Sequence, residues 1–72
     1  MTVKDVAKVL PRENRIELYV LGNEWLADAR RREPDVNITR RSSFEDWSQW
    51  AEKEVFRLEP YTRAICVFIY ED

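Results

Sequence analysis

The sequence predicts a small α+β domain, and three observations favour that class. At 72 residues, 44% of them hydrophobic and 36% charged, the chain has enough apolar material for one compact core. Segments with the apolar spacing of a helix alternate with segments of strand character. No repeat, low-complexity tract or linker divides the chain, so residues 1–72 are expected to form a single domain. We expect a mainly antiparallel sheet of about four strands with two helices, in the order helix, hairpin, helix, hairpin.

A short amphipathic helix is expected at the start of the chain. Thr2 and Asp5 have the spacing of a capping box, which satisfies two backbone N–H groups at a helix start. The apolar residues that follow recur with a helical period; they are Val3, Val6, Ala7 and Leu10. Pro11 ends this helix, because proline lacks the N–H group that a further helical turn needs.

The first hairpin is expected directly after this helix. Residues 16–21 alternate between two faces, as in a half-buried strand, and Gly22-Asn23 suits a two-residue hairpin turn. A return strand over residues 23–32 would match apolar groups on one face but would place Glu17 opposite Asp28 on the other. A helix from Glu24 to Arg32, capped by Asn23, is the rival interpretation. The sequence favours the hairpin and leaves the helix open.

The middle of the chain predicts an exposed connection followed by one long helix. Residues 30–42 are polar and contain a short edge strand at Val36 and Ile38. A serine cap at Ser42 or Ser43 opens the helix, which packs over one face of the sheet. Its apolar stripe comprises Phe44, Trp47, Ala51 and Val55, with Trp50 at the border.

The last strand is expected to lie in the centre of the sheet. Residues 55–58 have strand character, residues 59–62 resemble a turn, and residues 64–70 are rich in β-branched and aromatic types. Both faces of this last run are apolar. Such a strand requires cover on both sides, or a partner protein on one of them.

Side chains typical of catalytic sites are scarce. The chain has no histidine and one glycine, which argues against zinc or copper sites and against glycine-rich phosphate loops. Carboxylate pairs such as Glu45 with Asp46 have little room for a desolvated cleft in so small a domain. We therefore predict that the protein is not an enzyme and uses no cofactor. Cys66 is predicted to be a buried thiol, and the lack of a signal-peptide or membrane-spanning pattern predicts a cytoplasmic location.

Arginine and tryptophan are the residues of the chain best suited to contact a partner. Residues 29–43 carry five basic and two acidic side chains, whereas residues 44–72 carry three and seven. Guanidinium groups bind phosphates and carboxylates alike, and tryptophan with arginine is enriched in interface hot spots. Trp47 is assigned to the core. The predicted partner-binding residues are Arg30, Arg31, Arg32, Arg40, Arg41, Trp25 and Trp50.

Both ends of the sequence resemble small proteins encoded by phages and prophages of Gram-positive bacteria. The resemblance is carried by Thr2-Val3-Lys4-Asp5-Val6, by Leu10-Pro11 with Arg15-Ile16-Glu17-Leu18-Tyr19, and by Ala64-Ile65-Cys66-Val67-Phe68-Ile69-Tyr70-Glu71. Residues 30–50 depart from the pattern. The resemblance implies an accessory phage gene product in a bacterial host cell, and small acidic phage proteins of this size include inhibitors of host defence such as anti-CRISPR proteins.

These observations predict a non-enzymatic protein-binding module of phage or prophage origin, with inhibition of a bacterial defence complex as the role that the resemblance suggests. One alternative is a nucleic-acid-binding accessory protein that uses the basic segment Arg30–Arg41, although the net charge of −2 and the acidic end oppose a phosphate backbone. Another is a structural protein that associates with itself as a homodimer. No membrane partner is expected, and the sequence does not identify the protein partner.

Overall fold

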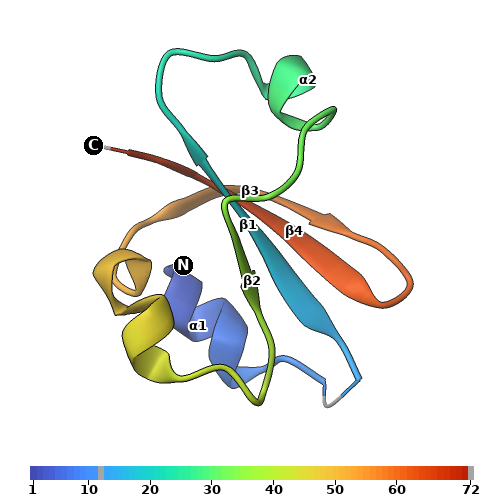
Figure 1. Cartoon of the computed structure of the whole chain (residues 1–72), viewed down its shortest axis with the longest axis vertical. Helices are drawn as coiled ribbons and strands as arrows, with labels where there is room; N and C mark the ends of the chain where they lie inside the picture. Colours follow the sequence, from blue (N-terminus) through green and yellow to red (C-terminus); the bar gives the residue numbers. More distant parts are fainter. Residues whose placement is uncertain (12, 72) are drawn as a thin grey trace.

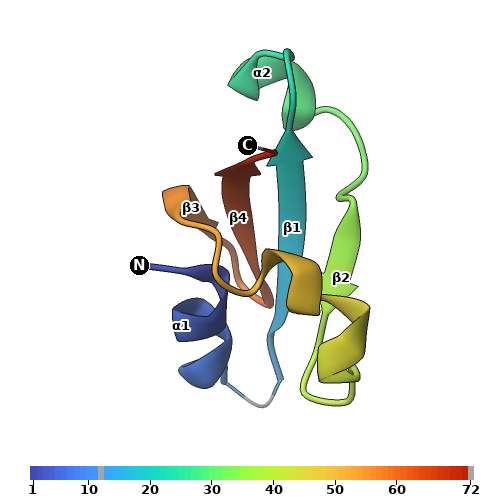
Figure 2. The same cartoon turned by 90° about the vertical axis from the view of Figure 1, so that its left-hand side faces the viewer.

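The computed structural model describes residues 1–11 and 13–71 and has a small α+β fold (Figure 1). Its elements are α1 (Val3–Lys8), β1 (Arg15–Leu21), α2 (Leu26–Ala29), β2 (Val36–Ile38), the 3₁₀ turns η1 (Phe44–Asp46) and η2 (Ser48–Trp50), β3 (Val55–Pro60) and β4 (Ala64–Tyr70). The strands form one four-stranded sheet in the order β2-β1-β4-β3. Helix α1 and the 3₁₀ turns lie against one part of the sheet, and α2 lies beyond the end of β1 (Figure 2). The predicted α+β class is confirmed.

The sheet is mixed, so the expectation of a mainly antiparallel sheet is wrong. The two central strands, β1 and β4, run parallel over their full length, from Arg15 beside Ala64 to Leu21 beside Tyr70. Antiparallel pairing occurs between β1 and β2 and between β4 and β3. Both central strands carry buried residues on both of their faces, and apolar area is best removed from water when such strands lie side by side in the middle. The central position of the last strand is confirmed.

The predicted hairpin at Gly22-Asn23 is wrong. A type I′ turn needs positive φ at both of its central residues, and neither of them has positive φ. The chain instead turns into α2, so the rival helix is present in a shortened form over Leu26–Ala29. This path avoids the unfavourable pairing of Glu17 with Asp28, because Glu17 lies beside Cys66 of β4. The order of elements is therefore not the alternation of helix and hairpin that the sequence suggested.

The long second helix over residues 44–55 is also wrong, because two short 3₁₀ turns replace it. Trp47 lies between them with a φ of −133°, outside the helical range. The carbonyls of Ala51 and Lys53 accept hydrogen bonds of 2.9 and 3.2 Å from backbone N–H groups in the first turn of α1. Those N–H groups have no partner within their own helix. The backbone after η2 therefore completes α1 instead of continuing as a helix.

Several local predictions are confirmed. The Thr2 hydroxyl accepts from the Asp5 N–H at 3.3 Å, and the Asp5 carboxylate accepts from the Thr2 N–H at 3.0 Å, which makes the capping box complete. Strand β2 is an edge strand that contains Val36 and Ile38. The final hairpin of β3 and β4 is present, with its turn between Pro60 and Ala64.

The apolar core divides into two clusters, one on each face of the sheet. The larger cluster lies under α1 and the 3₁₀ turns; its buried members are Val3, Val6, Leu10, Ile16, Leu18, Ile38, Trp47, Ala51, Val67 and Ile69. The assignment of Trp47 to the core is thereby confirmed. The smaller cluster lies on the opposite face; its buried members are Tyr19, Leu21, Ala29, Cys66 and Phe68. Within residues 1–11 and 13–71, the short helix α2 is the helix that covers this second face, through Leu26 and Ala29.

Candidate functional site

The sheet face opposite α1, which we call the open face, is only partly covered. In-register neighbours on adjacent strands point to the same side of a sheet. By register and ring contacts the open face comprises Glu17, Tyr19 and Leu21 of β1, Cys66, Phe68 and Tyr70 of β4, and Phe56, Arg57 and Glu59 of β3. Helix α2 packs Leu26 and Ala29 against one part of this face. Tyr19, Leu21, Cys66 and Phe68 are buried, so the part of this face that a partner can reach is the exposed group of Phe56, Arg57 and Tyr70.

Four aromatic rings, which we call the aromatic row, cross the open face. Tyr19 stacks on Phe68 with ring centroids 4.9 Å apart, and Phe56 stacks on Tyr70 at 4.2 Å. Phe68 and Phe56 connect the two pairs at 6.5 Å. Tyr19 and Phe68 are buried, whereas Phe56 is 40% and Tyr70 is 55% exposed. The row therefore has a buried end that stabilises the sheet and an exposed end that suits contact with a partner.

Arginine side chains surround two shielded carboxylates on the same face. Glu59 accepts hydrogen bonds from Arg30, which reaches across from the end of α2, and from Arg57 on its own strand at 3.0 Å. Glu17 accepts two hydrogen bonds from Arg15, at 3.0 and 2.8 Å. These arginine donors favour the ionised form of Glu59 and hold its pKa below the ordinary range.

A groove of about 500 Å³, which we call the arginine groove, lies between the start of β1 and the β3–β4 turn. Its lining residues are Arg15, Glu17, Tyr19, Arg30, Tyr61, Thr62, Arg63, Ala64 and Cys66. Three guanidinium groups and one carboxylate therefore line it. Arginine supplies several donors in a planar arrangement that matches carboxylates and phosphates, so the groove has the chemistry of an anion-binding surface.

The thiol of Cys66 lies in the lining of this groove but is poorly suited to nucleophilic chemistry. Burial, together with a hydrogen bond of 3.5 Å from the thiol to the Glu17 carboxylate, raises the pKa of Cys66 to about 11. A thiol with so high a pKa stays protonated near neutral pH, and only the thiolate is a strong nucleophile. The buried position predicted for Cys66 is confirmed.

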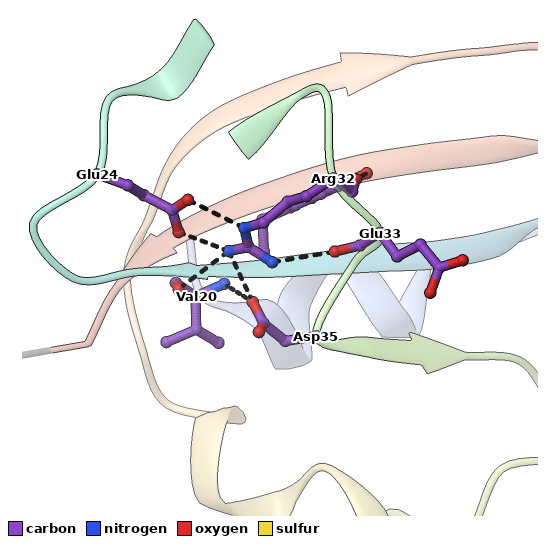
Figure 3. Close-up of polar contacts among 6 residues, drawn as sticks. Val20, Glu24, Arg32, Glu33 and Asp35 are labelled. Atoms are coloured by element: carbon purple, nitrogen blue, oxygen red, sulfur yellow. Dashed lines mark hydrogen bonds and ion pairs between the residues drawn. The ribbon is translucent and has the colours of Figure 1, made fainter. Parts of the chain in front are cut away.

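Arg32, one of the predicted contact residues, holds the α2 segment to the sheet. Its guanidinium binds Glu24 through two hydrogen bonds of 3.0 and 2.6 Å and binds Asp35 at 3.1 Å (Figure 3). It also donates to the backbone carbonyls of Val20 and Glu33. Most of the donors of Arg32 are therefore already used within the protein.

The other predicted arginines do not gather into one patch. Arg30 lies in the arginine groove, whereas Arg40 donates to the Leu10 carbonyl at 3.3 and 3.4 Å. Arg40 and Arg41 line a second depression of about 630 Å³, together with Arg15. Arg31 and Arg41 are exposed and form no ion pair with the described residues. A contact role for these residues stays a prediction.

The two predicted contact tryptophans have different surroundings. Trp25 is strongly exposed where α2 begins, and no side-chain cap fixes this helix start. Trp50 is half-buried and packs against the larger core cluster. Trp25 is therefore available to a partner, while Trp50 already contributes to the core.

The sequence alone does not predict most of the residues that form the open face and the arginine groove. Arg15, Arg57 and Arg63 come from segments that are not rich in basic residues, and Phe56 was assigned only to an extended segment. The strand pairing brings them together. The apolar character of both faces of the last strand was the one signal in the sequence that pointed to this surface.

No protein-family model matches the chain, and no curated protein or solved structure matches it at a significant level. No helix within the described residues is long and apolar enough to cross a membrane. Residues 1–11 and 13–71 contain no group of three or more side chains arranged to hold a metal ion.

Proposed function

We propose that the protein is a non-enzymatic module that binds another protein through its open face. The observation that carries this proposal is the exposed end of the aromatic row, Phe56 with Tyr70, next to the exposed Arg57 of β3. Aromatic residues and arginine are enriched at the centres of protein interfaces, and rigid aromatic rings bury a large area with little loss of side-chain freedom. Trp25 and Tyr61, both exposed, extend the same kind of surface.

The resemblance of the chain ends to phage and prophage proteins leads us to propose a cellular setting for this binding. The protein would act in the cytoplasm of a bacterial host, and its partner would be a component of a defence complex that it inhibits. An inhibitor of this kind needs only a binding surface, which agrees with the open face as the functional part of the molecule.

Affinity capture from the lysate of a natural host tests the proposal. Tagged wild-type protein and the variant with Phe56→Ser and Tyr70→Ser are compared after nuclease treatment, with retained proteins identified by mass spectrometry. Val9→Ser serves as the matched control, because Val9 is an exposed apolar residue at the end of α1. We expect a stoichiometric protein that wild type and the control retain and the double variant loses. Equal retention by all three proteins would exclude the open face as the binding surface.

A second candidate function, nucleic-acid binding, is favoured by one specific observation. Arg15, Arg40 and Arg41 converge around the depression at the start of β1. Basic side chains that neutralise phosphates release counterions, so binding of an oligonucleotide would weaken steeply with salt. Anisotropy of labelled single-stranded and duplex oligonucleotides over a salt series distinguishes this function, since protein binding through aromatic side chains depends less on salt.

A further inference from the structure

The arginine groove is positive although the whole chain has a net charge of −2. Arg15, Arg30 and Arg63 line it, against the carboxylate of Glu17 in the lining and that of Glu59, which pairs with Arg30. Many of the acidic residues of the chain lie elsewhere, in and after the 3₁₀ turns, at Glu45, Asp46, Glu52 and Glu54. Charges separated by more than about 8–10 Å are largely screened at physiological salt, so a partner in the groove would experience mainly these local charges, in which three arginines outnumber two carboxylates.

The guanidinium groups are more accessible than the carboxylates that they pair with. Side chains of Arg15 and Arg30 are 49% and 39% exposed, while those of Glu17 and Glu59 are 20% and 13% exposed. Arg15 uses Nε and Nη2 for Glu17, which leaves its Nη1 without a hydrogen bond to the described residues. Arg63 is exposed and forms no ion pair with them. The groove therefore presents unused donors to an incoming anion.

We propose that the arginine groove binds a carboxylate-rich segment of a partner protein. This inference rests on the proposed function and names the chemistry of the partner. Unused guanidinium donors of Arg15 and Arg63 would bind glutamate or aspartate side chains, and the exposed ring of Tyr61 would pack against the stem of the same segment.

A second copy of the chain is a poor occupant of this site. Two open faces brought together would oppose arginine with arginine, and like charges in an interface are unfavourable. Strand β3, an edge of the sheet, carries the protective features of natural edges, since it contains Arg57, Glu59, Pro60 and a register shift near Phe56. The N-terminus also covers its start, because the Val55 N–H donates to the Met1 carbonyl at 2.8 Å.

A single-stranded nucleic acid is also less suited to this site than an acidic peptide. Such ligands gain much of their affinity from bases stacked on aromatic ring faces. Tyr19 and Phe68 cover one ring face of each other, and the Arg32 guanidinium lies 5.4 Å from the centroid of the Tyr19 ring. Phe56 and Tyr70 likewise cover one face of each other. The aromatic row therefore offers few free ring faces, and the lining of the groove adds the single exposed ring of Tyr61, whereas carboxylate binding by arginine needs no ring face.

Fluorescence anisotropy with defined probes tests the inference. The probes are labelled octaglutamate, octaglutamine and octathymidylate, measured at low and physiological salt with wild-type protein and with the Arg15→Gln/Arg63→Gln variant. Arg31→Gln is the matched control for loss of positive charge, because Arg31 is exposed and lies outside the groove lining. Circular dichroism verifies that the variants are folded.

We expect wild-type protein to bind octaglutamate more tightly than the other two probes. Because the double variant loses two exposed arginine–carboxylate contacts, its affinity for octaglutamate should fall about fivefold. Arg31→Gln should lower that affinity by less than about twofold. Tighter binding of octathymidylate, an equal loss in the control, or no preference for octaglutamate over octaglutamine would overturn the inference. If lysate capture still depends on Phe56 and Tyr70 in any of those cases, the proposed function stands and only the acidic chemistry of the partner is wrong.

Discussion

Replacing Arg32 with glutamine removes the hydrogen bonds that hold the segment after β1 to the start of β2. The wild-type side chain makes charge-assisted hydrogen bonds to Glu24 and Asp35 and is 32% exposed. Hydrogen bonds to charged groups contribute about 1.5–3 kcal/mol in net stability, and partial exposure reduces that value. We therefore expect the free energy of unfolding to fall by about 2 kcal/mol. With a urea dependence of about 1 kcal/mol/M for so small a domain, the midpoint of urea unfolding would fall by about 2 M.

The adjacent residue provides the control for this prediction. Arg31 is exposed and forms no ion pair with the described residues, so Arg31→Gln should change the free energy of unfolding by less than about 0.5 kcal/mol. Arg32→Lys retains the charge but loses the bidentate geometry, and an intermediate midpoint is expected. Equal urea midpoints for the Arg31→Gln and Arg32→Gln variants would refute the structural role of Arg32. Arg32 would then again be a candidate for contact with a partner.

The remaining predictions concern the open face and its ionisable groups. Phe68→Ala should cost about 3–5 kcal/mol in thermal or urea unfolding because its ring is fully buried, whereas Phe56→Ala should cost less than about 1.5 kcal/mol. Hydrogen bonds from arginine lower the pKa of Glu24 and Glu59 below the ordinary 4.5. The stability that these ionised carboxylates contribute is therefore present above pH 4.5 and is lost as the pH falls below it. Urea midpoints should accordingly be lower at pH 3 than at pH 7. Burial raises the pKa of Cys66 from the ordinary 9.0 to about 11. The stability contributed by its protonated thiol is therefore fully present below pH 9 and is lost as the pH rises from 9 to about 11. A thiol reagent should accordingly label native Cys66 much more slowly than the urea-unfolded chain, and equal rates would contradict its burial.

The sequence predicts only part of the candidate site, because the fold decides which of its residues lie together. Residue type predicts Arg30 and Trp25 as contact residues, and the structure places Arg30 in the arginine groove and leaves Trp25 exposed. Arg32 is predicted for the same reason, yet four residues of the fold accept hydrogen bonds from its guanidinium; they are Val20, Glu24, Glu33 and Asp35. Arg63 was not selected, although it lines the groove. Residue type shows which groups are able to bind an anion, but only the surrounding fold shows which of them have unused donors.

The alternative structures that the sequence left open were decided by contacts between distant segments. Residues 23–32 have comparable strand and helix signals, but β2 and β4 occupy the two positions beside β1. No position is left there for a return strand over residues 23–32, and the short helix α2 forms instead. The segment after Trp50 left its helix because its carbonyls bond to the start of α1. Neither the strand pairing of β1 nor the hydrogen bonds to α1 can be predicted from a short stretch of sequence.

Features that depend on a few neighbouring residues can be predicted from the sequence alone. Local spacing and residue type predict four of them: the capping box of Thr2 and Asp5, the burial of Trp47, the short edge strand β2, and strand β4 with its two apolar faces. The tertiary structure decided the parallel pairing of β1 with β4, the helix in place of a hairpin, and the gathering of Arg15, Arg30 and Arg63 on one face. These outcomes depend on which segments bury the most apolar surface together, and that comparison is made over the whole chain at once.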